Sequence, residues 1–274
     1  MLHRRDLAEL EAWESISSES NASYTLYTPE EVIFGANTGY VLTPEAIIGP
    51  YWVKGELIRK NVTETQIGVP MHLDMQFVDI STCKPIPQLM IDIWSANATG
   101  VYSGIGSGEG GLDTSFLRGV QMSDRDGVVQ FDTIFPGHYT ERATHEHVTS
   151  HVNSTLLPNG TYTGGTVTHI GQLFFEESLK HKIEATYPYD QNTQAYTTND
   201  DDEGSIAANA TTAAYDPFPE WLMLSDQLSD GLLMWISIGV NMSANYDSDA
   251  IFAASWTADG GVANPNFSYS GTLP

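Results

Sequence analysis

Residues 71–96 read MHLDMQFVDISTCKPIPQLMIDIWSA, and this stretch decides the fold class. Apolar and polar side chains alternate through 71–80, a proline-containing turn follows at 84–87, and alternation resumes in 88–96. A period of two residues is typical of a strand that buries one face. The stretch therefore predicts two β-strands that pair as neighbours.

The same pattern continues on the C-terminal side of this stretch. Further strands are predicted at 128–131, 145–151, 166–175 and 232–240. The turn Asp126-Gly127 precedes the first of them. Short runs of Val, Ile, Thr, Tyr and Phe between Gly, Pro, Asn and Asp are typical of strands joined by turns. We expect a mostly β protein, an antiparallel β-sandwich with long irregular loops.

On the N-terminal side, a short helix is predicted at 6–16, because Leu7, Leu10 and Trp13 recur at helical spacing behind Asp6. Residues 21–51 are rich in Pro and Gly and predict an irregular arm. We therefore divide the chain into an N-terminal helix and arm, 1–40, and a β-sandwich domain, 41–274. The start MLHRRDL contains a dibasic pair, which is typical of a trimmed precursor.

The charge of the chain excludes some partners. With 35 acidic residues against 11 Lys and Arg, the net charge is −24, which argues against nucleic acid and against an anionic membrane surface. No apolar stretch reaches the ~18 residues of a membrane span. The acidic run NDDDEG at 199–204 predicts a solvated loop; a calcium site at Asp200, Asp201, Asp202 and Glu203 is less favoured because no EF-hand spacing is present.

Glycosylation signals indicate the compartment. Eight asparagines stand in N-x-[ST] sequons: Asn21, Asn61, Asn97, Asn153, Asn159, Asn209, Asn241 and Asn266. This number exceeds what the composition gives by chance and predicts a secreted, extracellular protein with N-linked glycans. The single cysteine, Cys83, cannot form an internal disulfide. We expect a buried inert thiol there, in preference to an intermolecular bridge.

Two tyrosines and two histidines form the main functional candidate: Tyr102, Tyr139, His145 and His147, the last three within PGHYTERATHEH at 136–147. In a strand the two histidines point to the same face. A phenolate is a hard anionic oxygen, so this donor set favours iron(III). Each residue has an ordinary alternative, as a solvated histidine on a surface strand or a tyrosine packed at a loop. Zinc held by the histidines would explain neither tyrosine.

Four segments carry a family resemblance in order: GPYW at 49–52, TCKPIPQLMIDIWSANATGVYSG at 82–104, LRGVQMSDRDGVVQFDTIFPGHYTERATHEH at 117–147 and GQLFFEE at 171–177. Together they resemble the intradiol ring-cleavage dioxygenases, the family of catechol 1,2-dioxygenase and protocatechuate 3,4-dioxygenase. They look most like its secreted, single-domain fungal branch. The resemblance covers about residues 40–178 and makes 41–274 an intradiol dioxygenase-like domain.

The resemblance implies roles for individual residues. Tyr102 and Tyr139 match the phenolate ligands of Fe(III), and His145 and His147 match the imidazole ligands. Tyr139 is further expected to leave the metal and accept a proton from the substrate. Arg142 matches the arginine that stabilises charge on the substrate, and Gln172 a glutamine that supports the site. The less favoured alternatives are that Arg142 is a surface ion-pair partner and Gln172 an ordinary strand residue.

These expectations define an extracellular non-haem iron(III) dioxygenase. It would cleave a small aromatic diol with O2 between the hydroxyl-bearing carbons and give a cis,cis-muconate-type diacid. Catechol, hydroxyquinol and larger catechols are all candidates, and a homodimer is one option. The alternative is a secreted β-sandwich module that binds a ligand or glycan without turnover.

Two further expectations concern the surroundings of the site. Glu146 stands between the histidines where the family usually has an apolar residue, which predicts a more polar or exposed reverse face for that strand. The pocket wall is expected around 49–52, with Leu73 and 104–108 as additional candidates.

Overall fold

The computed structural model describes residues 10–35, 46–106, 110–202 and 217–268. Its largest sheet has five strands: β2 (Pro70–Asp79), β3 (Lys84–Pro85), β6 (Val128–Ile134), β9 (Glu220–Met223) and β10 (Leu232–Val240). Their order is β3-β2-β10-β9, and β6 also pairs with β2. Strands β2 and β10 run parallel, so the sheet is mixed, whereas its other pairings are antiparallel.

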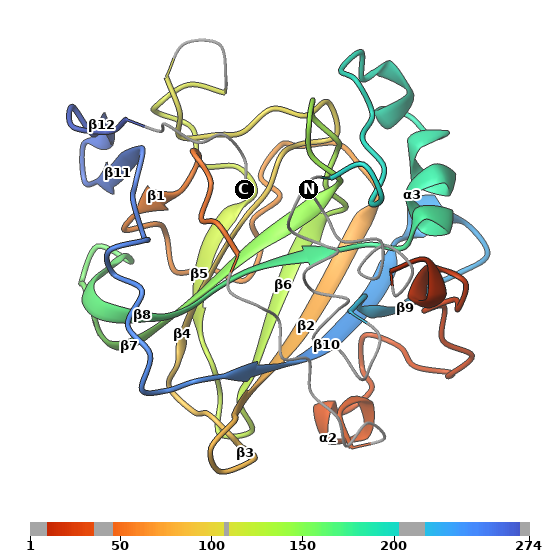
Figure 1. Ribbon diagram of the computed structural model, residues 1–274, viewed down its shortest axis with the longest axis horizontal. Helices are drawn as coiled ribbons and strands as arrows, with labels where there is room; N and C mark the ends of the chain where they lie inside the picture. Colours follow the sequence, from red (N-terminus) through yellow and green to blue (C-terminus); the bar gives the residue numbers. More distant parts are fainter. Residues whose placement is uncertain (1–9, 36–45, 107–109, 203–216, 269–274) are drawn as a thin grey trace.

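A second, fully antiparallel sheet has the order β5-β4-β7-β8. Its strands are β4 (Met90–Trp94), β5 (Arg118–Met122), β7 (His145–Leu156) and β8 (Tyr162–Phe174). A small third sheet lies at one end of the molecule and has the order β1-β11-β12 (Figure 1). It consists of β1 (Val53–Lys54), β11 (Ala254–Thr257) and β12 (Gly260–Ala263).

The main core joins the two large sheets. Leu73 and Phe77 of β2 belong to one buried cluster with Ile91 and Ile93 of β4 and Leu173 of β8. Burying these apolar side chains from both sheets is the main force that holds the layers together. The mostly β prediction is confirmed, and the predicted strands at 128–131, 145–151, 166–175 and 232–240 correspond to β6, β7, β8 and β10.

The predicted pairing of the first two strands is wrong. Strand β2 pairs with β3, β6 and β10, whereas β4 lies in the other sheet between β5 and β7. Two left-handed residues in the connection, Cys83 (φ 54°) and Gln88 (φ 58°), accompany the turn away from β2. All five residues of β4 are buried, so the strand needs cover on both faces and lies inside the sandwich.

Helical structure lies outside the sheets. Residues 10–14 are helical, in agreement with the prediction for that part of 6–16, and Leu10 packs against Phe174 of β8. The other helices of the described residues are α2 (Glu30–Ile33), α3 (Glu177–Glu184) and the 3-10 turns η1 (Tyr189–Gln191) and η2 (Leu228–Asp230). None of the helices in the described ranges has the length and apolar character needed to cross a membrane.

The expectation for Cys83 is wrong, because its side chain is exposed. The residue follows directly on the turn that closes β2, where Ser81 and Thr82 donate hydrogen bonds to the Asp79 carboxylate. A turn of this kind faces water, so the thiol does not enter the core.

Candidate active site

The two histidines of the H-x-H pair converge at the start of β7. Both are buried, and their Nε2 atoms lie 3.0 Å apart. Nδ1 of His145 lies 2.7 Å from the backbone oxygen of Ala143, which can only accept a hydrogen bond, so Nδ1 carries the proton and Nε2 keeps its lone pair. The ring of His147 stacks on Trp94 of β4 at 4.5 Å and 7°. Strand pairing thus fixes both imidazoles.

The loop before β7 brings Tyr139 to the same point. Its phenol oxygen lies 3.2 Å from Nε2 of His145. Gly137 makes this approach possible, since a Cβ there would lie 2.3 Å from the backbone oxygen of Asn97. Tyr102, in the segment that follows β4, is 1 % exposed, and its ring centroid lies 5.5 Å from Tyr139 and 6.1 Å from His147. The structure therefore brings together all four predicted ligands.

Burial controls the protonation of this cluster. Desolvation lowers the pKa of His145 and His147 well below the usual value, so both imidazoles are neutral at pH 7. Desolvation also raises the pKa of Tyr139 to about 12 and that of Tyr102 well above its usual value. Neutral imidazoles are ready to bind a metal, whereas the phenols ionise only beside a strong cation.

The donor set fits iron(III) in its chemistry. Nε2 of both imidazoles and the phenol oxygen of Tyr139 lie together, with the buried ring of Tyr102 beside them, and hard anionic oxygen suits a hard trivalent cation. Within the described ranges, no three His, Cys, Asp or Glu side chains gather as a metal site. A metal bound here would therefore depend on the tyrosine oxygens.

Arg142 and Gln172 lie beside the cluster and contact each other. The guanidinium Nη2 of Arg142 donates a hydrogen bond of 2.6 Å to Oε1 of Gln172, and Gln172 pairs with His147 across β7 and β8. Gln172 also donates from Nε2 to the backbone oxygen of Ile47 at 3.1 Å. Both side chains are buried, so the surface ion-pair alternative for Arg142 does not hold.

Comparison with known proteins places the chain in a family. A family model described as Dioxygenase matches residues 47–162. The intradiol ring-cleavage dioxygenase of Tetranychus urticae is 32% identical, with 74% of this chain and 96% of that chain covered and a TM-score of 0.63. The dioxygenase Tetur07g02040 is 30% identical, with 76% and 97% covered and a TM-score of 0.64. This chain belongs to the intradiol ring-cleavage dioxygenases. Comparison with curated protein sequences gave no match.

The acidic run of this dioxygenase supplies a residue that the sequence analysis missed. Asp202 was assigned to a solvated loop, but it is 2 % exposed. Its carboxylate accepts hydrogen bonds from Nε of Arg142 at 3.1 Å and from the backbone N–H of Ala143 at 2.8 Å. Asp202 thereby fixes the guanidinium and the loop that leads into His145. Glu203 lies outside the described residues.

Arg142 stays charged in this setting. Burial alone would lower its pKa, but the nearby Tyr139 and the ion pair with Asp202 outweigh burial, and the pKa is raised. A fixed positive charge next to the phenol of Tyr139 suits stabilisation of an anion bound at the cluster. The position agrees with the role predicted for Arg142.

Two residues of the predicted pocket wall at 49–52 lie next to the cluster. Tyr51 stacks on Tyr102 at 4.5 Å and meets Tyr139 edge-on at 6.3 Å. Gly49 packs so closely that a Cβ would lie 3.3 Å from Cε1 of His147. The expectation for Leu73 is wrong, since this side chain is fully buried in the core between the sheets. Of the segment 104–108, positions 107–108 lie outside the described residues.

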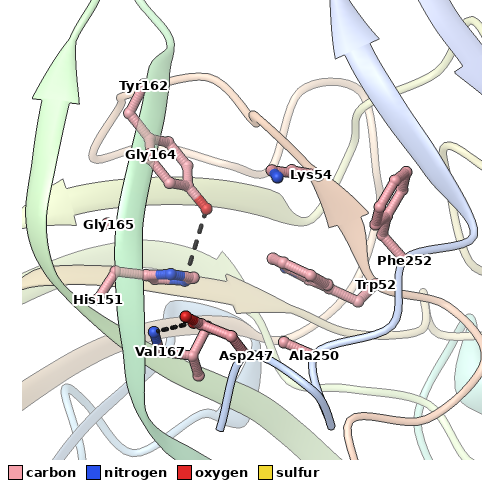
Figure 2. A pocket seen from close by; sticks show the side chains of 10 residues that line it. All are labelled: Trp52, Lys54, His151, Tyr162, Gly164, Gly165, Val167, Asp247, Ala250 and Phe252. Atoms are coloured by element: carbon pink, nitrogen blue, oxygen red, sulfur yellow. Dashed lines mark hydrogen bonds between the residues drawn. The ribbon is translucent and has the colours of Figure 1, made fainter. Parts of the chain in front are cut away.

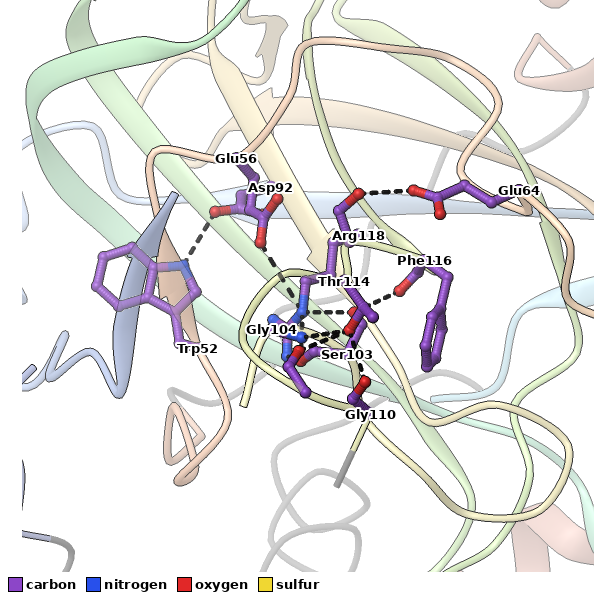
Figure 3. Close-up of polar contacts among 12 residues, drawn as sticks. Trp52, Glu56, Glu64, Asp92, Ser103, Gly104, Gly110, Thr114, Phe116 and Arg118 are labelled. Carbon is purple, nitrogen blue, oxygen red and sulfur yellow. Dashed lines mark hydrogen bonds and ion pairs between the residues drawn. The ribbon is translucent and has the colours of Figure 1, made fainter. Parts of the chain in front are cut away.

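Glu56, Asp92 and Arg118 form a group of buried titratable residues that the sequence did not reveal (Figure 3). Nε of Arg118 lies 3.8 Å from Glu56, and its guanidinium lies 6.0 Å from the ring centre of Tyr102. Desolvation raises the pKa of Glu56 to about 7 and that of Asp92 to about 8. Asp92 accepts hydrogen bonds from the indole of Trp52 at 2.9 Å and the phenol of Tyr162 at 3.3 Å.

Glu146 belongs to the same buried environment, which corrects the expectation of an exposed reverse face. Its side chain is 0 % exposed. Desolvation raises its pKa to about 8, and Ser95 and Arg118 offset part of that effect. The carboxyl is therefore mainly protonated at pH 7, and a neutral acid replaces the family's apolar residue without adding a full charge to the interior.

Proposed function

We propose that the chain is a non-haem iron(III) intradiol dioxygenase that opens catechols between the two hydroxyl-bearing carbons. The expected product is a cis,cis-muconate-type diacid that incorporates both atoms of O2. The observation that carries the proposal is the convergence of Nε2 of His145, Nε2 of His147 and the phenol of Tyr139, with separations of 3.0 and 3.2 Å. Tyr102 completes a donor set that suits Fe(III).

The role of the metal follows from its charge. Iron(III) bound by two phenolates and two imidazoles would act as a Lewis acid that holds the two oxygens of the diol and makes the ring reactive toward O2. The bound metal would also supply the positive charge that both buried phenols need in order to ionise, since burial alone raises their pKa.

The protein groups have separate tasks in this proposal. Tyr139 accepts a proton from one catechol hydroxyl, because its oxygen lies at the edge of the cluster within hydrogen-bonding distance of His145. Arg142 stabilises the negative charge of the deprotonated diol, and Gln172 and Asp202 hold the guanidinium in place. Tyr51 and Trp94 cover Tyr102 and His147 and exclude water.

Iron analysis combined with oxygen uptake tests this function. The purified protein is expected to contain one iron per chain and to show a visible band from phenolate-to-iron charge transfer. With catechol it should consume one O2 per ring and form the ring-opened diacid, identified by mass spectrometry. An iron-loaded protein without the visible band would refute the tyrosine ligands. A coloured protein that binds catechol without O2 uptake would instead support a binding module.

We further propose that the protein is secreted and carries N-linked glycans. Six sequon asparagines have exposed side chains: Asn21, Asn61, Asn153, Asn159, Asn241 and Asn266. Asn97 differs, since its amide nitrogen donates to Gln66 at 3.0 Å and its amide oxygen accepts from Thr99 and Val101. Enzymatic glycan removal followed by peptide mapping should find glycans at several exposed sites and none at Asn97. Material secreted by a eukaryotic host without any glycan would contradict the proposal.

A further inference from the structure

A cavity lined by Trp52 lies outside the tyrosine and histidine cluster. It has a volume of about 320 Å³, and Figure 2 shows its walls, which come from β1, β7, β8 and the segment that precedes β11. None of the four predicted metal ligands lines it. The volume is at the lower end of the ~300–1,000 Å³ of small-molecule sites, which suits a ligand of about one ring.

The walls favour an aromatic ring that enters by its edge. Trp52 and Tyr162 line the cavity but are only 4 % and 5 % exposed, and the indole meets Phe252 edge-on at 6.4 Å. A sugar binds best on an exposed aromatic face, and here Trp52 is stacked on His151 at 6.0 Å. A planar ring needs only a slot between such side chains.

His151 supplies a polar atom on the wall. The side chain is 3 % exposed, and its Nε2 lies 3.0 Å from the hydroxyl of Thr149 and 3.5 Å from the phenol of Tyr162. Nδ1 has no hydrogen-bond partner within the described part of the chain. When Nε2 accepts from the Thr149 hydroxyl, Nδ1 carries the proton of the neutral ring and can donate to a ligand oxygen.

Lys54 adds a positive charge at the rim. Its exposed ammonium lies 5.6 Å from the ring centre of Phe252. Although acidic residues outnumber Lys and Arg 35 to 11, no carboxylate of the described residues lies within ion-pair distance of this ammonium. Asp247, also on the wall, is held by the backbone N–H of Val167 at 2.8 Å. Lys54 is therefore available to pair with an anionic group at the rim, although the carboxylate of Asp247 adds a negative group to the same wall.

We propose that this cavity binds a small aromatic carboxylate. The ring lies between Trp52, Tyr162 and Phe252, the carboxylate pairs with Lys54, and Nδ1 of His151 contacts a polar atom of the ligand. The site is separate from the proposed catalytic cluster and does not depend on its function. The two are nonetheless adjacent, because Tyr51 stacks on Tyr102 while Trp52 lines the cavity.

Calorimetric titration with benzoate tests the proposal. The iron-loaded protein is first saturated with catechol in the absence of O2, so that benzoate cannot occupy the metal. Benzoate is expected to bind with one site per chain. Lys54→Met should weaken this binding by about tenfold or more, because a charge-assisted contact is lost. Lys60→Met is the matched control, since Lys60 is exposed, bonds Gln130 and does not line the cavity.

A second variant and a second probe complete the test. Ala250→Phe fills the cavity without changing its charge and should abolish benzoate binding. Benzyl alcohol, which has no charge, should bind the parent and Lys54→Met equally. Absence of benzoate binding at millimolar concentration, or affinity unchanged in both cavity variants, would overturn the proposal. If the protein does not bind catechol, the titration is done without catechol. The same variants then test whether benzoate binds in this cavity.

Discussion

His147 and His151 lie four residues apart on β7 and share most of their surroundings. Each is buried, each stacks on a tryptophan, and desolvation lowers the pKa of both. Their Nε2 atoms differ. That of His147 faces Nε2 of His145, whereas that of His151 faces the hydroxyl groups of Thr149 and Tyr162. Burial and residue type are thus the same at both positions, but only His147 faces a second imidazole.

This difference separates a metal site from a hydrogen-bonded histidine. At 3.0 Å one of the two Nε2 atoms can donate a proton to the other, and a metal ion in place of that proton would accept the lone pairs of both. A hydroxyl can donate to an imidazole, so Nε2 of His151 has its partner within the protein. Thr149 lies between the two histidines on the strand and bonds His151, so His151 does not belong to the metal cluster.

Exchanging each histidine for glutamine should give the largest contrast. His147→Gln removes a ligand and is expected to reduce iron retention and catechol turnover by more than the roughly 10–100-fold that loss of a supporting residue costs. His151→Gln should leave the iron content and the visible spectrum unchanged. Metal analysis of both purified variants, with oxygen uptake, measures this. Equal loss of iron in the two variants would mean that the comparison is wrong.

The same contrast applies to the tyrosines. Tyr139→Phe removes the proposed base while three metal donors remain, so iron should be retained and turnover should fall by about 100-fold. Tyr162→Phe, which removes the phenol beside His151, is the matched control and should retain turnover. Stopped-flow mixing with catechol separates slow substrate binding from loss of metal. Normal binding kinetics in Tyr139→Phe would exclude the assigned role.

Loss of the carboxylate that holds Arg142 should reduce turnover less than loss of a metal ligand. Asp202→Asn keeps the shape of the side chain but removes the charge that holds the guanidinium, and kcat/KM for catechol should fall by about 10-fold with iron retained. Asp201→Asn is the control, because Asp201 is exposed and, among the described residues, its side chain bonds Thr198 in the same turn. A variant of Asp202 with unchanged kcat/KM would show that Gln172 alone positions Arg142.

Contacts that are local in sequence were predictable, and distant ones were not. The H-x-H pair follows from the two-residue period of a strand, so the convergence of His145 and His147 required only that β7 form. Asp202 reaches Arg142 across 60 residues, and nothing in its acidic neighbourhood distinguishes it from a solvated residue. The family resemblance supplied Arg142 and Gln172 but not the partner that holds them.

The strand pairing and the burial of Glu146 show the same limit. Alternation in 71–96 correctly predicted two strands, but it carries no information on which sheet each joins. Glu146 was expected to need water because carboxylates usually do. Its burial depends on Ser95 and Arg118, which lie on other strands or loops, and on a raised pKa that only the assembled site produces.

The smallest expected effect concerns Asp92 and the pH dependence of folding stability. Asp92 shares the phenol of Tyr162 with His151. Asp92 has a pKa of about 8 in the folded protein against 3.8 when unfolded, so the folded state keeps a proton that the unfolded state has lost. Because of this extra proton in the folded state, the free energy of unfolding falls as the pH rises toward 8. The buried histidines oppose this trend in part, because above pH 6.5 the unfolded state still releases their remaining protons while the folded state holds none, but their contribution does not depend on Asp92. Between pH 6.5 and 8, Asp92 should cost about 1–2 kcal/mol of stability.

Asp92→Asn tests this effect, since asparagine keeps an acceptor for the indole of Trp52 but has no proton to lose. Urea unfolding at pH 6.5 and 8 should give a smaller stability difference in the variant than in the parent. Asp126→Asn, an exposed carboxylate paired with Arg125, should behave like the parent. Glu56 and Glu146 keep part of the pH dependence in all three proteins, because their pKa values are also raised. An identical pH dependence in parent and Asp92→Asn would mean that Asp92 is ionised in the folded protein. The surroundings of His151 would then hold a buried charge, as the metal cluster does.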